Sequence, residues 1–225
     1  MTHEATVRRG ECDVMKPGWI FAALGATLTL TTPLHAAEDP VDPNTIDIVD
    51  AIECRLDAPA YMGFALALNG EEKIAAKRHW VRIATRNAFL NEYDLPAPIT
   101  VAGHYSTRRI AFTSSGVVAI LDLADPNGLA REQEIKNAVD PSPLLEAMIA
   151  SGKATPAEIA AATRSSKFLG EKIVADRTEA PAAGESYGAR TVITRNVSNV
   201  TTHPGKTFYG CSYRMEVIGK DGQPL

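Results

Sequence analysis

The sequence predicts an α+β fold, in which an antiparallel sheet of about six strands carries N-terminal helices and a helical insertion packed against it. Three observations predict this fold. Apolar residues recur at helical spacing twice between residues 45 and 68. Runs rich in branched and aromatic residues follow at 99–123, close enough in sequence to pair as an antiparallel meander. After a helical stretch at 125–167, further strand-like runs close the chain.

Residues 1–37 are expected to be a cleavable export signal. An apolar run from Trp19 to Leu34 follows a basic start, and Ala36 and Ala37 provide the small residues of a cleavage site. Met15 is then the expected initiator. The alternative is a membrane anchor, but a run of about 16 residues is shorter than the roughly 20 that a spanning helix needs. We therefore expect a soluble periplasmic or secreted protein with no integral membrane anchor after cleavage.

The cysteines agree with export. The chain has three, and Cys12 precedes the apolar run, so cleavage leaves the pair Cys54 and Cys211. In an oxidising compartment such a pair is expected to form a disulfide. Two independent buried thiols are the alternative.

Residues 38–44 are expected to form an exposed leader, 45–218 a single α+β domain and 219–225 a tail. The first helix is predicted at 45–56, with Asn44 as its N-terminal cap and Cys54 on the helix. A second helix is predicted to begin at the cap Asp57 with Pro59 in its first turn. The stretch 71–93 carries both helical and strand signals and stays mixed.

Pro96 and Pro98 predict a break before the meander. Its strands are predicted at 99–105, 109–113 and 117–123. The expected turns are Ser106-Thr107 and Ser114-Ser115-Gly116.

The helical insertion is predicted to include a helix that begins at Thr155-Pro156-Ala157-Glu158 and continues through 159–162. In this start, the threonine and the glutamate can satisfy each other's backbone donors. The last strands are predicted at 171–176, 191–200 and 207–218. A hairpin turn at His203-Pro204-Gly205-Lys206 is expected to join the final two.

Charge argues against a nucleic-acid partner. The chain has 23 Lys and Arg against 27 Asp and Glu, a net charge of −4, and no basic stripe. The histidines after the expected cleavage site, His79, His104 and His203, lie on separate segments without metal-ligand spacing. We expect neither a metal nor another cofactor.

The sharpest catalytic hypothesis combines His104 with Ser114 or Ser115 and Asp122, because a base, a hydroxyl and an acid fall on adjacent predicted strands. It would make the protein a hydrolase that acts on envelope or extracellular material. The alternative interpretation is an ordinary hairpin turn, since the sequence has no Gly-x-Ser-x-Gly elbow.

A non-enzymatic binding or interaction module is the favoured prediction, with a protein or a small apolar ligand as its partner. The predicted binding residues are Tyr105, Arg108, His203 and Lys206, on loops that a stable sheet would present. The aromatic residues could line a concave ligand pocket, or they could fill the core.

Overall fold

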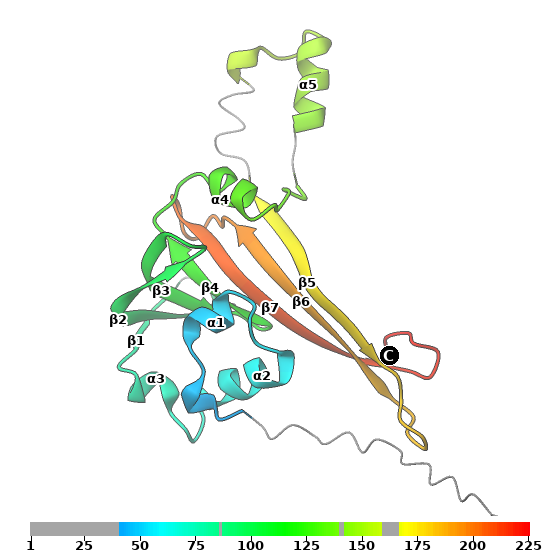
Figure 1. Cartoon of the computed structure of the whole chain (residues 1–225). Helices are drawn as coiled ribbons and strands as arrows, with labels where there is room; N and C mark the ends of the chain where they lie inside the picture. The colour runs from blue at the N-terminus through cyan, green and yellow to red at the C-terminus, as the bar shows by residue number, and fades with distance from the viewer. Residues whose placement is uncertain (1–40, 86, 140–141, 159–166) are drawn as a thin grey trace, which may run out of the picture. The chain divides into compact units, whose positions relative to one another are not determined.

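The computed structural model describes residues 41–85, 87–139, 142–158 and 167–225, and a seven-stranded antiparallel sheet runs through them (Figure 1). The strand order is β1-β2-β3-β4-β7-β6-β5. The strands are β1 (Val81–Ile83), β2 (Asn91–Val101), β3 (Tyr105–Phe112), β4 (Gly116–Leu121), β5 (Leu169–Glu179), β6 (Gly188–Ser198) and β7 (Thr207–Ile218). The predicted α+β class and the meander are confirmed, with one strand more than expected.

Short helices cover one face of this sheet. They are η1 (Pro43–Thr45), α1 (Ile48–Ile52), α2 (Ala58–Ala67) and α3 (Ile74–Lys77). In Figure 1, α1 and α2 lie in front of the strands, and α1 contacts β2, β4 and β7 while α2 contacts β7. We call this helix-covered side the core face.

The predicted cap of α2 is confirmed, because the Asp57 carboxylate accepts a hydrogen bond from the backbone N–H of Ala60 at 2.7 Å. The prediction for the first helix was wrong in its boundaries. Asp47, not Asn44, caps α1, and the helix ends at Ile52. Cys54 therefore lies beyond the helix, in a left-handed backbone conformation with a φ of 58°.

The predicted break at Pro96 and Pro98 was also wrong, since β2 runs through both residues. The pairing of β2 with β3 is irregular between Asp94 and Ile99. Proline has no N–H to donate to the ladder, so the prolines fall where the ladder is interrupted and the strand continues past them.

The turn between β2 and β3 differs from the prediction. Ala102 and Gly103 have positive φ values of 47° and 84° and reverse the chain, whereas Ser106-Thr107 lies within β3. The turn between β3 and β4 is confirmed, because the N–H of Thr113 donates to the carbonyl of Gly116 at 2.8 Å.

The helical insertion contains α4 (Asn127–Glu132) and α5 (Ser142–Ala150). The Thr155 start is confirmed, since Thr155 N–H donates to the Glu158 carboxylate at 2.8 Å and Glu158 N–H donates back to the threonine hydroxyl at 3.3 Å. The predicted continuation through 159–162 lies outside the described residues. So do the expected signal at 1–37 and the first residues of the leader.

A disulfide joins Cys54 to Cys211, with Cα atoms 5.3 Å apart, and confirms the predicted pairing. Cys211 is in β7, which lies between β4 and β6 near the middle of the sheet. The bond therefore ties the segment after α1 to a central strand.

Most of the aromatic residues within the described ranges fill the core. Tyr61 of α2 stacks on Tyr213 of β7 with ring centroids 4.2 Å apart, and the Tyr213 hydroxyl donates to the Ala51 carbonyl. Tyr209 donates its hydroxyl to Glu53 at 2.8 Å. Burial raises the pKa of Tyr61, Tyr209 and Tyr213, and Glu53 raises that of Tyr209 further. We refer to these three residues as the core tyrosines.

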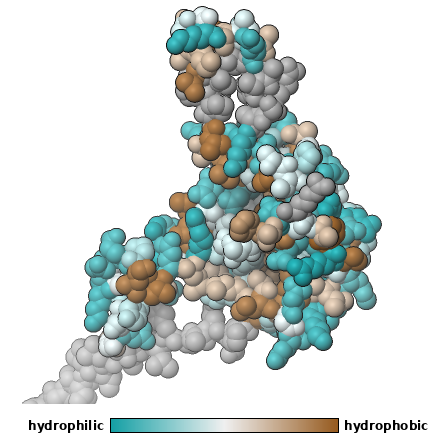
Figure 2. Space-filling view, turned by 180° about the vertical axis from the view of Figure 1, so that it is seen from behind, coloured by the Kyte–Doolittle hydropathy of each residue, from teal (hydrophilic) through white to brown (hydrophobic). Residues whose placement is uncertain are grey.

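The other face of the sheet carries a second, smaller apolar cluster, made of Leu90, Ala111, Val118, Ile120 and Phe208. Opposed residues of an antiparallel pair share a face, and Ile120 pairs with Phe208 while Ala111 pairs with Val118. Figure 2 views the molecule from behind and shows hydrophobic residues set among hydrophilic ones. We call this side the outer face. No helix within the described ranges is long and apolar enough to cross a membrane.

Candidate functional site

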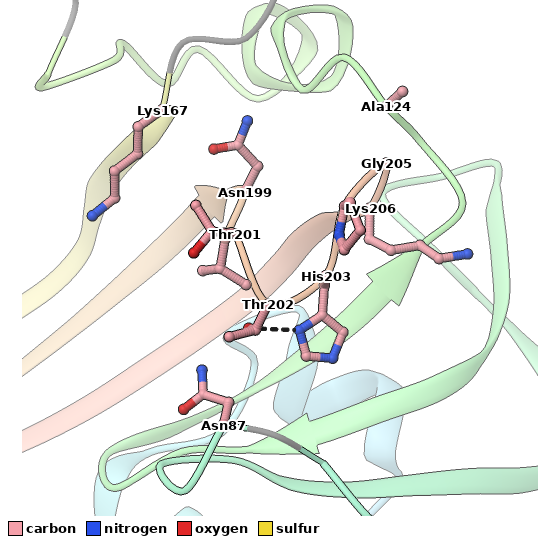
Figure 3. A pocket seen from close by; sticks show the side chains of 11 residues that line it. Asn87, Ala124, Lys167, Asn199, Thr201, Thr202, His203, Gly205 and Lys206 are labelled. Atoms are coloured by element: carbon pink, nitrogen blue, oxygen red, sulfur yellow. Dashed lines mark hydrogen bonds between the residues drawn. The ribbon is translucent and has the colours of Figure 1, made fainter.

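The loop between β6 and β7, residues 199–206, forms the main part of a pocket of about 500 Å³ (Figure 3). We call it the loop pocket. Its lining consists of Asn87, Ala124, Lys167, Asn199, Val200, Thr201, Thr202, His203, Pro204, Gly205 and Lys206. The lining mixes apolar surface with amide, hydroxyl and imidazole groups, which is the usual composition of a small-molecule site.

A tight turn gives the loop its shape. The N–H of Lys206 donates to the carbonyl of His203 at 3.2 Å, and Gly205 has a φ of 73°, a conformation that glycine adopts without strain. The predicted hairpin turn at 203–206 is thus confirmed. Immediately after it, the Thr207 hydroxyl donates to the carbonyl of Leu123 at 2.7 Å and fixes the start of β7.

A buried carboxylate holds the loop against the outer face. Glu92 of β2 is 1% exposed. One of its oxygens accepts a hydrogen bond from Arg109 of β3 at 2.7 Å, and the other lies 2.9 Å from Nε2 of His203. The imidazole also packs edge-on against the Phe208 ring, with centroids 5.1 Å apart. A buried charge is tolerated when it is paired and hydrogen-bonded, and both conditions hold for Glu92.

The contacts continue from the imidazole into the loop pocket. Nδ1 of His203 lies 3.0 Å from the hydroxyl oxygen of Thr202, the contact drawn as a dashed line in Figure 3. An ionised carboxylate can only accept, so we assign the proton of the neutral ring to Nε2. Nδ1 then presents its lone pair to the threonine hydroxyl. The result is a continuous hydroxyl, imidazole and carboxylate chain at the pocket surface.

Two of the predicted binding residues, His203 and Lys206, line the loop pocket. The Lys206 ammonium forms an ion pair with Asp122, and its side chain points away from His203 in Figure 3. Lys206 therefore lies at the rim of the pocket, where its charge is paired with Asp122.

The other two predicted binding residues lie elsewhere. Arg108 lines a second pocket of about 310 Å³ together with Asp122 and Lys206, and its Nε donates to the carbonyl of Leu95 at 2.8 Å. Tyr105 lines neither pocket. Its hydroxyl donates to Glu132 at 3.2 Å, and partial burial, followed by the charge of Glu132, raises its pKa.

The predicted combination of His104 with Ser114 or Ser115 is not brought together. His104 precedes β3 and the serines follow it, so the eight residues of that strand separate them by about 25 Å. His104 is exposed and lies 3.9 Å from Glu132, while Asp122 is committed to Lys206. The serines belong to the β3–β4 turn, as the alternative interpretation held.

Three residues of the site were missed by the sequence reasoning: Glu92, Arg109 and Thr202. Glu92 falls in the stretch 71–93, whose signals are mixed, and Arg109 falls in the predicted strand 109–113. A buried acid and a distant histidine carry no local signal that links them, because 111 positions separate Glu92 from His203.

Over the ranges that the structure describes, no group of three or more His, Cys, Asp or Glu side chains is placed to hold a metal ion. Comparisons with protein-family models, with curated proteins and with solved structures found no match to this chain.

Proposed function

We propose that this protein is exported and acts outside the cytoplasm as a binding protein, with the loop pocket as its ligand site. The observation that carries the proposal is the pocket of about 500 Å³ built on the β6–β7 loop and secured by the buried Glu92. Small-molecule sites commonly have volumes of about 300 to 1,000 Å³, and the volume of the loop pocket falls within this range.

The scaffold under the loop suits a binding role. Beta6 and β7 pair along the whole of β6, from Gly188 opposite Ile218 to Ser198 opposite Phe208, so the loop leaves two rigid, paired strands. The contact of His203 with Glu92 then orders the loop before any ligand arrives. Ordering in advance reduces the entropy that binding would otherwise cost.

The lining favours a small molecule with both polar and apolar parts over the small apolar ligand that the sequence predicts as a partner. Val200 and Pro204 offer apolar contact, while Asn87 and Thr201 offer hydrogen-bonding groups. The core tyrosines are buried under the helices and are not available to a ligand.

Export is supported by the disulfide, because such bonds persist in oxidising compartments and are rare in a reducing cytosol. The export signal at 1–37 is tested by mass spectrometry of protein collected outside the cytoplasm. The mass of the N-terminal peptide should correspond to cleavage after Ala36 or Ala37, and no thiol should react with an alkylating reagent. A chain that still carries residues 16–36 would contradict export with cleavage.

Ligand binding is tested by native mass spectrometry of residues 38–225 after incubation with a small-molecule extract of the cell envelope. We expect an added mass that disappears when Thr201→Trp fills the pocket. Thr178, also an exposed threonine, lies on β5, and Thr178→Trp is the control that should retain the added mass. Equal binding by both variants would place the ligand outside the loop pocket and refute the proposed site.

A further inference from the structure

We propose that the loop pocket contains a catalytic hydroxyl: Thr202, activated by His203 and oriented through Glu92, cleaves small carboxylic esters bound there. This inference rests on the proposed function in one respect, since it uses the same pocket as the ligand site. It adds a reaction to binding, and it replaces the His104 combination with residues that the structure does bring together.

The hydrogen bonds give each group the role that nucleophilic catalysis needs. His203 is only 11% exposed, so its ring is held between its two partners. Because Glu92 accepts the Nε2 proton, the lone pair of Nδ1 faces the Thr202 hydroxyl at 3.0 Å. This distance lies within the range for a base that removes a hydroxyl proton during attack.

Arg109 acts as a positioning residue. It donates to the Glu92 oxygen that His203 does not use, at 2.7 Å, and so balances the buried negative charge. The same contact fixes the orientation of the carboxylate, which in turn fixes the tautomer and the plane of the imidazole. Glu92 remains an acceptor throughout, as the acid of a hydroxyl, histidine and carboxylate site does.

Thr202, at the accessible end of the hydroxyl, imidazole and carboxylate chain, is the nucleophile. Thr202 is exposed and lines the loop pocket, while Glu92 is buried beneath it. Asn87 lines the same pocket, and its Oδ1 accepts the N–H of Phe89 at 3.0 Å, so its amide nitrogen is the end that can donate. In Figure 3 this nitrogen points toward Thr202. It is therefore available to donate to the oxygen of a bound ester that develops negative charge during attack.

The reaction balances with water as the only co-substrate. The Thr202 oxygen attacks the ester carbonyl carbon while its proton passes to Nδ1 of His203. The tetrahedral intermediate then breaks its bond to the alcohol oxygen, which takes that proton and leaves. Water, deprotonated by the same Nδ1, attacks the acyl-threonine ester, and the threonine oxygen leaves and regains the proton. The products are a carboxylic acid and an alcohol.

Covalent labelling tests the nucleophile directly. An alkyl fluorophosphonate forms a bond from phosphorus to an activated hydroxyl and releases fluoride. Incubated with residues 38–225, it should add one phosphonyl group, located on Thr202 by peptide mass spectrometry. Thr202→Val should abolish the adduct and Thr202→Ser should retain it. Thr178→Val removes an exposed hydroxyl on β5, away from the residues that line the loop pocket, and should label like the wild type.

Turnover of 4-nitrophenyl acetate gives a second measurement on the same variants, with circular dichroism to verify folding. The Thr202→Val rate should fall by about 100-fold or more, the contribution typical of an activated group. Absence of an adduct on folded wild-type protein, or an equal adduct on Thr202→Val, would overturn the inference. If an envelope molecule binds without any adduct, the proposed function stands and the reaction fails. If the adduct forms on Thr202 but no envelope molecule binds, the reaction stands and the binding role fails.

Discussion

Removal of the Cys54–Cys211 bond is expected to lower the free energy of unfolding by about 5 kcal/mol. The perturbation is the double substitution Cys54→Ala with Cys211→Ala. The two cysteines are 157 positions apart, so the bond closes nearly the whole described chain into one loop. In the chain-entropy treatment a loop of this length reduces the entropy of the unfolded chain by about 17 cal/mol/K, which gives the stated value at 25 °C.

Urea denaturation measures this loss. In the chain that begins at residue 38, Trp80 is the single tryptophan, and its ring lies 6.1 Å from Tyr93 and 6.4 Å from Phe112. Its fluorescence therefore reports the opening of the aromatic core. With a denaturant slope of about 2 kcal/mol per molar urea, the midpoint should fall by roughly 2.5 M.

Two controls separate the bond from the substitutions. Wild-type protein treated with a reductant should unfold at the midpoint of the double variant, and the double variant should not respond to reductant. The left-handed backbone at Cys54 is occupied by a residue with a Cβ in both proteins, so its strain cancels. A loss below about 1 kcal/mol, far under the expected value, would refute the loop-entropy reasoning.

Three further predictions concern charge and packing. The core tyrosines have pKa values raised by burial, so above about pH 10 the unfolded chain binds fewer protons than the folded one and stability falls with pH, by up to about 4 kcal/mol per pH unit for all three. Urea titrations from pH 9 to 11 measure this slope, and Tyr213→Phe should reduce it by about a third; an unchanged slope would contradict the assignment. Glu92→Gln should lower the free energy of unfolding by about 1 to 3 kcal/mol. The control Glu72→Gln, in an exposed ion pair, should change it by less than about 0.5 kcal/mol. Equal losses for the two variants in thermal melts would count against a buried network. In Gly210→Ala the new Cβ would lie 2.1 Å from a carbonyl oxygen of β4, so we expect the free energy of unfolding to fall by more than about 3 kcal/mol. Gly63→Ala, with open space around it in α2, should raise it by up to about 1 kcal/mol. A Gly210→Ala variant as stable as the wild type in urea denaturation would refute the close approach.

Local chemistry made several elements predictable. Asp57 and Pro59 mark the start of α2 because a carboxylate satisfies the free N–H groups of a first turn. Proline followed by glycine marks the turn after His203 because these residues match its backbone angles. The β7 strand was predicted at its observed bounds, since its branched and aromatic residues are bounded by that turn.

The errors occurred where tertiary contacts overrode a local signal. Pro96 argues locally against a strand, but an irregular ladder lets β2 pass through it. The site was harder still, because Glu92 and His203 meet only through the strand order of the sheet. That order places β7 beside β4, which no pattern within either strand indicates. Sequence reasoning could therefore find the loop but not the acid beneath it.

The position of β7 has a consequence for how the protein is made. The last strand in the chain lies between β4 and β6, so the two halves of the sheet stay unjoined until residues 207–218 have been synthesised. A ribosome-bound chain can form the hairpins of each half, but the core around Tyr209 cannot assemble before β7 is present. Loss of the final twenty residues would thus leave two separate fragments of sheet, each with an open inner edge, rather than a slightly shortened protein.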